Sequence, residues 1–423
     1  MRTLAEWLAL QDSVHPKTID MGLARVSAVA RTLGVDKPSS RVITVGGTNG
    51  KGSTVAHLDA LLRAAGASTG MFTSPHFIRY NERIRVGGVE VDDAELISAF
   101  ERIDAARGST TLTFFEYNAL AALVIFADRA VDVAILEVGL GGRLDAVNLV
   151  AADVAIVCSI GFDHRDYLGD SLEQIGAEKA GIFRSGRPAV LSTPDMPGSV
   201  YATLQTVGAR AVVAERDFSW QVEAAAGLVR WSYHGLRVAL RNLPPSALEG
   251  SIQYRNASSA IAAIESLDAG YTLNEQTVSQ ALRDVRLAGR FQVVPGPVEW
   301  ILDIAHNEPA ARVFAGHVRE RGFAGERTFA VVGILADKDA REIAAALEPL
   351  VDHWILCSLP GARGSSASDL ANRLRLPPDQ VTLANSVEEG CEAARAATVA
   401  GDRVIVFGSV YTVGPALRWL RVY

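Results

Sequence analysis

Short runs of apolar and β-branched residues recur along this 423-residue chain, and Ala/Leu-rich stretches with helical spacing separate many of them. The runs predict strands at Arg41–Val45, Val131–Val138, Asp153–Ile160, Pro188–Ser192, Val298–Ile304, Phe329–Leu335, His353–Leu359 and Arg403–Gly408. Strands that alternate with helices favour an α/β fold, whose mainly parallel sheets are covered on both faces. Ligands of such folds bind at the carboxyl ends of the strands.

Helical spacing is clear after the first predicted strand. Apolar residues there fall on one predicted helix face, namely Val55, Leu58, Leu61, Leu62 and Ala65, and Gly66 follows as a stop signal. Residues Ser171 to Gln174 match a capping box, which predicts a helix that begins there and ends near Gly181. An apolar helix is also predicted from Thr113 to about Phe126.

A domain boundary is predicted near Ala288–Pro297, which holds two prolines and two glycines and precedes a fresh series of strands and helices. We therefore expect an N-terminal domain over residues 1–288 and a smaller Rossmann-like α/β domain over 289–423. From Ala211 to Leu243 polar and apolar residues alternate, with Trp220, Trp231 and Tyr233 among them. That pattern predicts a small antiparallel sheet at the edge of the first domain.

Charge and composition exclude several classes of protein. The net charge of −7 argues against a nucleic-acid partner, and no apolar run approaches the roughly 20 residues that span a bilayer. The N-terminal residues include acidic ones and lack a signal-peptide core, so a cytoplasmic protein is expected. Cys158, Cys357 and Cys391 are scattered, which argues against a disulfide framework or a zinc site.

Lysine is rare in this chain. Lys and Arg together number 41, yet only five are lysines, and the simplest cause of that imbalance is codon bias. Where Arg is the usual cation, a lysine can mark a position that needs an amine. The five are Lys17, Lys37, Lys51, Lys179 and Lys338.

The segment from Val45 to Ser53 (VGGTNGKGS) joins a predicted buried strand to a predicted helix. Glycines let the backbone curl so that its amides point at a phosphate, and the helix N-terminus adds a favourable dipole. Lys51 would place positive charge on the β- and γ-phosphates, and Ser53 could hydrogen-bond them or approach a metal. The segment therefore predicts a nucleotide-binding loop, although Gly52 separates Lys51 from Ser53, unlike the usual pattern.

The Gly-inserted loop resembles that of the folylpolyglutamate synthase and dihydrofolate synthase family, relatives of the Mur amide ligases. Further motifs follow in the family's order and cover most of the chain, at 73–84 (TSPHFIRYNERI), 137–148 (EVGLGGRLDAVN), 161–169 (GFDHRDYLG), 178–183 (EKAGIF), 289–292 (GRFQ), 303–307 (DIAHN) and 337–339 (DKD). The resemblance implies ATP binding by the loop residues Asn49, Gly50, Lys51, Gly52 and Ser53.

The resemblance also implies magnesium ligands. Glu137 ends a predicted strand, where it could instead cap or pair with an Arg such as Arg143; in the family the matching Glu holds magnesium together with a serine, here Ser74. The family's match to His164 binds a second Mg²⁺, although a lone His is more often structural. Two ions are therefore expected, and a monovalent cation is allowed.

Lys179 lies in the last turn of a predicted helix, where a cation favours the helix dipole. Arg could serve that purpose equally well. A neutral Lys amine can add CO₂ to give an anionic carbamate that binds Mg²⁺, which Arg cannot do. The resemblance implies that the matching lysine of the family is carbamylated, so we expect a carbamate at Lys179 as well. Lys51, Glu137, His164 and Lys179 are thus the predicted catalytic residues.

A pterin pocket is implied near the predicted helix after Thr113, where core packing and a first-turn carboxylate are the simpler interpretation. Its lining by resemblance is Thr113, Phe114, Phe115, Glu116, Leu144, Asp145 and Ala146. A flat heterocycle suits stacking on an aromatic ring, and its polar edge suits a carboxylate such as Asp145.

Other motif residues are ambiguous between helix capping and ligand binding. Asn256 could be the N-cap of a helix over Ala257–Leu267, and Asn307 of one over Pro309–Gly322. The resemblance implies ATP contacts for Asn256, Arg290 and Asp303. It implies weaker roles, toward glutamate or phosphate, for His306, Asn307 and Lys338. The chain reads His-Asn-Glu-Pro where the family usually has His-Asn-Pro, which affects only the local turn.

The function that follows is ATP-dependent ligation of L-glutamate to 7,8-dihydropteroate, giving dihydrofolate, and to reduced folates, giving folylpolyglutamates, through an acyl phosphate. The expected partners are small molecules, with no nucleic acid and no membrane, and the family resemblance favours a monomer. Three alternatives remain: a Mur-type ligase for a UDP-muramoyl substrate, a P-loop ATPase without ligase activity, and an inactive folate-binding paralogue.

Overall fold

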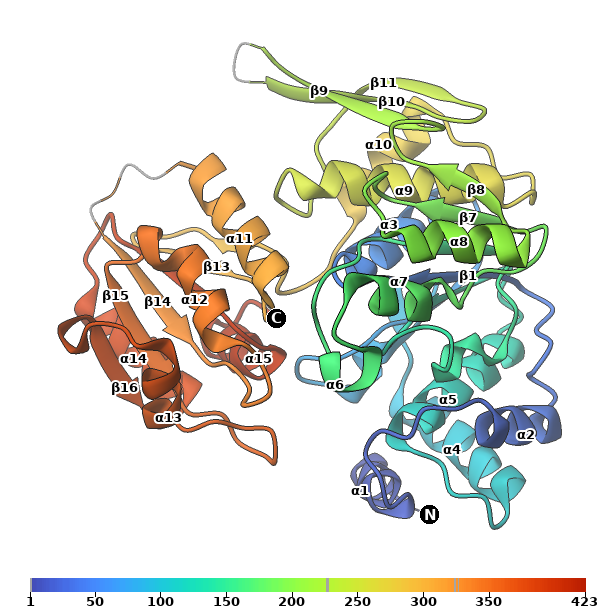
Figure 1. Cartoon of the computed structure of the whole chain (residues 1–423), viewed down its shortest axis with the longest axis horizontal. Helices are drawn as coiled ribbons and strands as arrows, with labels where there is room; N and C mark the ends of the chain where they lie inside the picture. The colour runs from blue at the N-terminus through green and yellow to red at the C-terminus, as the bar shows by residue number, and fades with distance from the viewer. Residues whose placement is uncertain (1, 226–227, 323–324, 326) are drawn as a thin grey trace. The chain divides into compact units, whose positions relative to one another are not determined.

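The computed structural model describes residues 2–225, 228–322, 325 and 327–423. The chain divides into two compact units, one of residues 1–247 with 253–285 and the other of 248–252 with 286–423. Figure 1 colours both along the chain. The boundary that we expected at 288/289 lies just after this division. Residues 248–252 join the second unit although they precede the last helices of the first.

The first unit is built on an eight-stranded sheet with the order β4-β3-β2-β5-β1-β6-β7-β8. Its strands are β1 (Arg41–Gly46), β2 (Thr69–Phe72), β3 (Ile84–Val86), β4 (Val89–Glu90), β5 (Val133–Glu137), β6 (Val154–Val157), β7 (Pro188–Leu191) and β8 (Arg210–Val213). Six of them, β2, β5, β1, β6, β7 and β8, run parallel to one another, and β3 and β4 add an antiparallel edge beside β2. The predicted parallel α/β sheet is confirmed.

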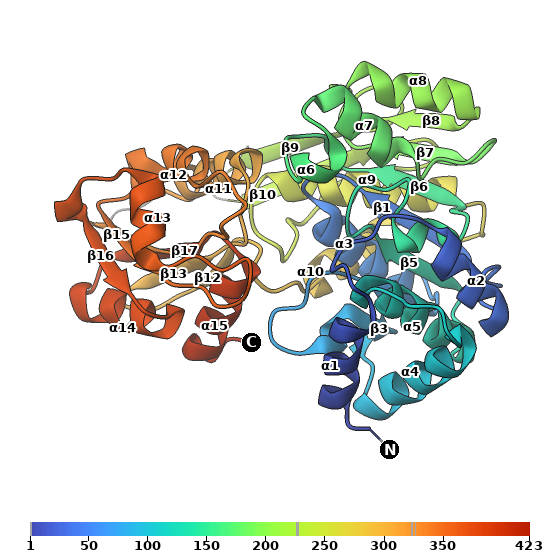
Figure 2. The same cartoon turned by 60° about the horizontal axis from the view of Figure 1, so that its bottom comes forward.

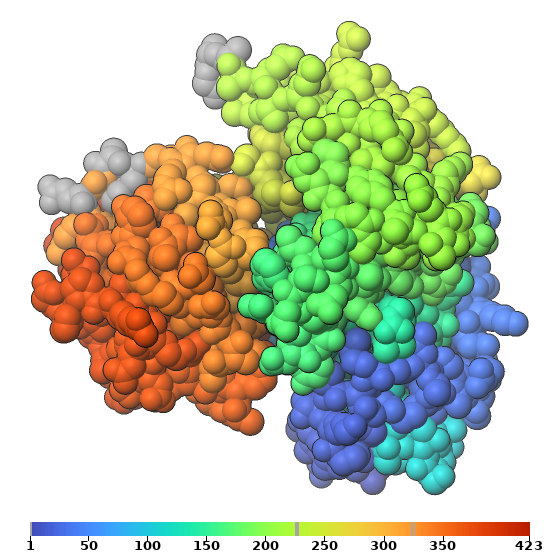
Figure 3. Space-filling view, viewed as in Figure 1, coloured from blue at the N-terminus to red at the C-terminus, as the bar shows by residue number. Residues whose placement is uncertain are grey.

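Helices cover the sheet of this unit. They are α1 (Leu4–Val14), α2 (Ala24–Leu33), α3 (Lys51–Ala64), α4 (Asp93–Arg107), α5 (Phe114–Asp128), α6 (Arg165–Leu168), α7 (Leu172–Ala180), α8 (Gly198–Val207), α9 (Ile252–Ser266) and α10 (Glu275–Asp284). Figure 2 shows α7 and α8 together beside β7 and β8. In the space-filling view the blue N-terminal segment lies against the cyan segment of α4 (Figure 3).

Helix α3 differs from the prediction in its burial. We expected one apolar face, but every residue from Gly52 to Leu62 is buried. The sheet lies on one side of α3, and α10 packs against it on another. Small and polar residues such as Ser53, Thr54 and His57 fill the remaining sides, so the apolar stripe alone understated the burial.

A three-stranded antiparallel sheet follows, with β9 (Ser219–Ala225), β10 (Leu228–His234) and β11 (Ala239–Leu243) in the order β11-β10-β9. The sheet was predicted, but its start at Ala211 was wrong, because residues through Val213 form β8 of the parallel sheet. Residues 226 and 227 of the predicted range lie outside the described residues. Glu265 of α9 accepts hydrogen bonds from the Arg237 and Val238 amides at 2.7 and 2.8 Å, which anchors the turn between β10 and β11.

The second unit has a six-stranded sheet with the order β12-β13-β17-β14-β15-β16, parallel except for β12. Its strands are β12 (Gln292–Val294), β13 (Glu299–Leu302), β14 (Thr328–Val332), β15 (His353–Cys357), β16 (Val381–Ala384) and β17 (Arg403–Phe407). Its α-helices are α11 (Glu308–Glu320), α12 (Ala340–Leu347), α13 (Ala367–Leu374), α14 (Val387–Ala397) and α15 (Val410–Leu420).

The core of the second unit includes Trp354, Phe314 and Phe407. The short 3₁₀ helices of the chain are η1 (Tyr80–Arg83), η2 (Ala146–Leu149), η3 (Glu348–Leu350) and η4 (Pro378–Gln380). Within the described part of the chain, no helix combines the length and the apolar character that crossing a bilayer requires.

Candidate active site

The phosphate loop connects β1 to α3 at the centre of the first sheet. Gly47 and Gly50 have positive φ angles of 139° and 91°. A Cβ on Gly47 would lie 3.1 Å from the Cys158 and Ser159 nitrogens, so the loop packs directly on the segment after β6. The Thr48 amide donates to the Ser159 carbonyl at 2.7 Å, and the Asn49 amide donates to the Ser159 hydroxyl at 3.0 Å. The loop is therefore held in place before any ligand arrives.

Two lysines converge on this loop. Lys51 Nζ donates to the carbonyls of Gly47 (2.9 Å) and Thr48 (3.1 Å), and Lys179 Nζ donates to the same Gly47 carbonyl at 3.1 Å. Burial, and then the positive charge of Lys51, lower the pKa of Lys179 from 10.5 to about 7. Lys179 therefore has a substantial fraction of neutral amine near neutral pH, as a carbamate-forming lysine requires.

Glu137 ends β5, and its Cα pairs across the sheet with that of Val45, which immediately precedes the phosphate loop. The side chain is buried and accepts a hydrogen bond from the Ser74 amide at 3.2 Å. Arg143, which sequence reasoning offered as a partner for Glu137, pairs with Glu178 at 2.7 Å instead. The structure thus brings Glu137 and Ser74 together beside the phosphate loop.

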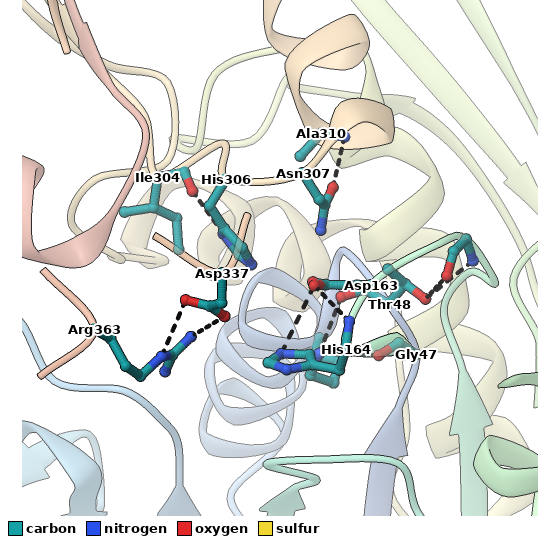
Figure 4. A network of polar contacts seen from close by, with 12 residues as sticks. Gly47, Thr48, Asp163, His164, Ile304, His306, Asn307, Ala310, Asp337 and Arg363 are labelled. Carbon is teal, nitrogen blue, oxygen red and sulfur yellow. Dashed lines mark hydrogen bonds and ion pairs between the residues drawn. The ribbon is translucent and has the colours of Figure 1, made fainter. Parts of the chain in front are cut away.

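His164 follows β6 and is the N-cap residue of the short helix α6, with a left-handed φ of 51°. Its Nε2 lies 3.9 Å from Asp163 Oδ1, and its amide donates to the same oxygen at 2.9 Å. Figure 4 shows this pair next to Thr48 and Gly47. Sequence reasoning selected the His and missed Asp163, although a carboxylate next to a candidate ligand was the available signal.

The candidate magnesium ligands lie after neighbouring strands. Ser74 follows β2, Glu137 ends β5, and His164 follows β6, and β1 with its phosphate loop separates the last two in the sheet order. Among the described residues no group of three or more His, Cys, Asp or Glu side chains is arranged to hold a metal ion. The expected set is different in kind, because it combines a hydroxyl, one carboxylate, one imidazole and a lysine carbamate.

The start of α5 departs in part from the expected pocket. Thr113 and Glu116 form a capping box, and Glu116 also pairs with Arg25 at 3.2 Å. The Glu116 carboxylate is therefore engaged by protein groups. Phe114 and Phe115 are partly exposed, and a Cβ on Gly139 would lie 2.5 Å from the Phe115 ring, so a larger residue at 139 would displace that ring.

Asp145 organises the loop after β5. Its carboxylate accepts the Leu140 amide at 2.8 Å and the Val147 amide at 3.0 Å, and it caps the 3₁₀ helix η2. Burial raises the pKa of Asp145 to about 6, and the charge of Lys51 opposes that rise. Leu144 is partly exposed beside it, and Ala146 is buried. Asp145 thus has a structural role that its sequence motif did not reveal.

Asn256 is not the N-cap that we considered, because α9 already begins at Ile252 and places Asn256 in its second turn. Asn256 Nδ2 donates to Gln253 Oε1 at 3.0 Å. Its Oδ1 is buried without a hydrogen-bond partner, and a Cβ on Gly50 would lie 3.1 Å from that oxygen. A buried, unsatisfied acceptor against the phosphate loop fits a position that contacts a ligand.

In the second unit, Asp303 follows β13 and accepts the Phe291 and Ala305 amides, both at 2.8 Å. Burial raises the pKa of Asp303, and the charge of Arg290 opposes the rise. Asn307 caps α11 by accepting the Ala310 amide at 3.0 Å, which is one of the two roles that the sequence left open, and His306 Nδ1 bonds to the Ile304 carbonyl at 2.8 Å. Figure 4 also shows these two contacts.

Lys338 lies in the loop between β14 and α12, and its side chain is partly exposed. Its carbonyl accepts a hydrogen bond from Arg373 Nη2 at 2.5 Å. The preceding Asp337 pairs with Arg363 through both carboxylate oxygens, at 3.2 and 2.7 Å (Figure 4). Backbone and neighbouring side chains therefore hold this loop.

Two family models match the chain. The Mur ligase middle domain matches residues 45–202, and the Mur ligase glutamate ligase domain matches residues 289–410. The first match covers the phosphate loop, Ser74, Glu137, His164 and Lys179. The second covers Arg290 through Lys338 and extends to α15.

Curated relatives match nearly the whole chain. The dihydrofolate synthase/folylpolyglutamate synthase of Escherichia coli is 42% identical over 98% of this chain and 95% of its own length. The protein of the same name from Haemophilus influenzae is 39% identical over 97% of this chain and 96% of its own length.

Solved structures of similarly named proteins also match nearly the whole chain. Escherichia coli FolC in complex with DHPP and ADP superposes with a TM-score of 0.93 at 40% identity, over 99% of this chain and 98% of that one. A bifunctional folylpolyglutamate synthase/dihydrofolate synthase from Yersinia pestis, complexed with AMPPNP and Mn ion, gives 0.90 at 39% identity, over 100% and 99%. A bifunctional enzyme of the same name, with Mn, AMPPNP and L-glutamate bound, gives 0.91 at 38% identity, over 100% and 99%.

Proposed function

Since the chain belongs to the dihydrofolate synthase/folylpolyglutamate synthase family of Mur ligases, we propose that it is an ATP-dependent ligase that joins L-glutamate to dihydropteroate and to reduced folates. The observation that carries this proposal is the convergence of the phosphate loop, Glu137, Ser74 and Lys179 at the carboxyl ends of adjacent strands. The relatives' complexes with ADP, DHPP and L-glutamate support the same reaction.

The reaction proceeds in two steps, phosphoryl transfer and then amide formation. A carboxylate oxygen of the acceptor attacks the γ-phosphorus of ATP, the bond to the β-phosphate oxygen breaks, and ADP leaves. The glutamate amine then attacks the acyl carbon of the resulting acyl phosphate. The tetrahedral adduct loses a proton from nitrogen and expels inorganic phosphate, which leaves an amide. Charge neutralisation and alignment are the main demands of such phosphoryl transfer.

The first unit supplies the phosphate-binding groups. Asn49, Gly50, Gly52 and Ser53 would present loop and helix amides to the phosphates, because a helix N-terminus attracts anions. Lys51 would exchange its two loop carbonyls for phosphate oxygens, to which a charged amine binds more strongly. Asn256 Oδ1, buried without a partner, would accept a hydrogen bond from the bound nucleotide.

Two magnesium ions would be held by Ser74, Glu137, His164 and a Lys179 carbamate, and the proposal allows a monovalent cation as well. When bound, these ions neutralise phosphate charge. Carbamate formation joins the Lys179 nitrogen to the carbon of CO₂ and releases a proton, so it requires the neutral amine that a pKa of about 7 provides.

The second unit, residues 289–423 in our assignment, would close over ATP and glutamate. Arg290 and Asp303 would contact ATP, and closure would align the reactants. His306, Asn307 and Lys338 are the candidates for glutamate or phosphate contacts. If the Asn307 side chain turned to contact a ligand, it would give up its hydrogen bond from the Ala310 amide, and α11 would lose its N-cap.

The pterin would lie near the start of α5 and the loop after β5. Phe114 and Phe115 are the partly exposed rings available for stacking, and Leu144, Asp145 and Ala146 would line the opposite side. Thr113 and Glu116 act first as the capping box of α5, so their contribution to the pocket is to fix the direction of that helix.

The setting that we propose is cytoplasmic folate and one-carbon metabolism. The protein would act as a monomer on small molecules, without nucleic-acid or membrane partners. Gel filtration with light scattering tests the monomer: a single species near 45 kDa supports it, and a dimer mass contradicts it.

Phosphate release tests the proposed reaction. With ATP, Mg²⁺ and L-glutamate present, we expect release with dihydropteroate and with tetrahydrofolate, and no release without glutamate. Release with a UDP-muramoyl acceptor and with neither folate would favour a Mur-type peptidoglycan ligase. Hydrolysis that needs neither acceptor nor glutamate would indicate a simple ATPase. The Lys51→Met variant is the control for contaminating phosphatase.

A further inference from the structure

A hydrogen-bond chain that is buried at His57 and partly buried at Ser246 links the phosphate-binding helix to the segment that leaves the first unit. His57 of α3 is 1% exposed. Its Nδ1 lies 2.8 Å from the Ser53 carbonyl, and its Nε2 lies 2.9 Å from the Ser246 hydroxyl. Ser53 belongs to the phosphate loop, and Ser246 comes one residue before the chain leaves the first unit at Ala247.

The direction of both hydrogen bonds follows from chemistry. A carbonyl oxygen only accepts, so Nδ1 of His57 carries the proton. Burial lowers the pKa of His57 to about 4, so the ring is neutral at physiological pH and its Nε2 is an acceptor. The Ser246 hydroxyl must therefore donate to Nε2. One tautomer of one ring thus connects Ser246 to the first turn of α3.

Further contacts connect Ala247, where the chain leaves the first unit, to the helices beside the phosphate loop. The Ala247 amide donates to the Leu282 carbonyl of α10 at 2.7 Å, and α10 packs against α3. Leu282 lies three residues before Val285, where the chain leaves the unit for the second time. Both exits are therefore tied to the helix whose N-terminus faces the phosphates.

We infer that His57 and Ser246 are positioning residues for nucleotide binding, which hold the first turn of α3 in register with the segment that leads into the C-terminal unit. Neither residue lies in the loop that binds phosphate; both act through the Ser53 backbone. The inference rests on the proposed nucleotide site, because a shift of that turn would change the affinity only of a ligand that binds the amides of the turn. It predicts that loss of the Ser246 hydroxyl weakens ATP binding without altering the folate pocket.

The test compares three full-length variants with the wild type. Ser246→Ala removes the donor, and Ser246→Thr retains a hydroxyl. Ser266→Ala removes a buried hydroxyl that donates to the Ala262 carbonyl at 2.7 Å, elsewhere in the same unit, and is the matched control. The readouts are the Kd of Mg·ATP by calorimetry, without folate or glutamate, and the KM values of the ligation assay.

Ser246→Ala should raise the Kd and the KM of ATP about threefold to tenfold, the range expected when one such hydrogen bond is lost. The KM of dihydropteroate should stay within twofold, and Ser246→Thr should restore most of the affinity. A Kd for Ser246→Ala within twofold of wild type overturns the inference, as does an equal loss in Ser266→Ala. If the wild type binds ATP but forms no ligation product, the proposed function fails and the binding test still decides this inference.

Discussion

Lys179 allows a quantitative prediction about stability. Its amine has a pKa of about 7 in the folded protein against an ordinary value of 10.5. Between these two values the unfolded chain binds a proton that the native protein does not, so the free energy of unfolding must rise with pH in that window. Below about pH 7 both states are protonated, and the native protein then bears the full cost of a buried charge, about 5 kcal/mol.

The measurement compares wild type with Lys179→Met by urea denaturation in CO₂-free buffer. Titration of this one amine should make the wild type gain about 1–2 kcal/mol relative to the variant between pH 7.0 and 8.5. Lys17→Met, which removes a lysine with a 68% exposed side chain, is the matched control and should track the wild type. A wild-type curve parallel to that of Lys179→Met would refute the buried-amine reasoning.

Bicarbonate extends this experiment to the carbamate. A carbamate that forms only on the native protein stabilises it by mass action. Added bicarbonate with Mg²⁺ should therefore raise the unfolding free energy of the wild type and leave that of Lys179→Met unchanged. Equal responses of the two proteins would rule out a stabilising carbamate at this position.

Three further outcomes follow from the site. Lys51→Met should lower kcat about 10²- to 10³-fold with little change in Tm, as expected for the loss of one charged transition-state contact, and a smaller loss would argue against that contact. Asn256→Ala should raise the KM of ATP but not that of dihydropteroate, and a matching rise in both would contradict a nucleotide contact. Gly50→Ala should cost about 1–2 kcal/mol in urea denaturation, because φ is +91° and the new Cβ would meet Asn256 Oδ1; an unchanged stability would disprove the strain.

Strands such as β1, β5 and β6 could be predicted from sequence because buried parallel strands appear as continuous apolar runs, whereas β2, the short strand before Ser74, was not predicted. The order β2-β5-β1-β6 could not, since neighbours in the sheet are far apart in the chain. That order is what places Ser74, Glu137 and His164 around the phosphate loop. The family resemblance supplied their grouping, which local patterns alone do not contain.

Other features depend on contacts between distant residues. The polar residues Gln253 to Arg255 hid the true start of α9, and so Asn256 was taken for a possible cap. The capping box at Thr113 was not recognised, although its Thr-x-x-Glu spacing was visible. The His57–Ser246 bond joins residues 189 positions apart, and no local pattern indicates it.

The central claim is that ATP activates the acceptor carboxylate as an acyl phosphate before glutamate attacks. The direct test uses dihydropteroate labelled with ¹⁸O in its carboxylate, together with ATP, Mg²⁺ and L-glutamate. If the carboxylate attacks the γ-phosphorus, one ¹⁸O atom leaves in each inorganic phosphate, and dihydrofolate forms in equal amount. Mass spectrometry should therefore detect singly labelled phosphate. Dihydrofolate formed together with unlabelled phosphate would contradict this account.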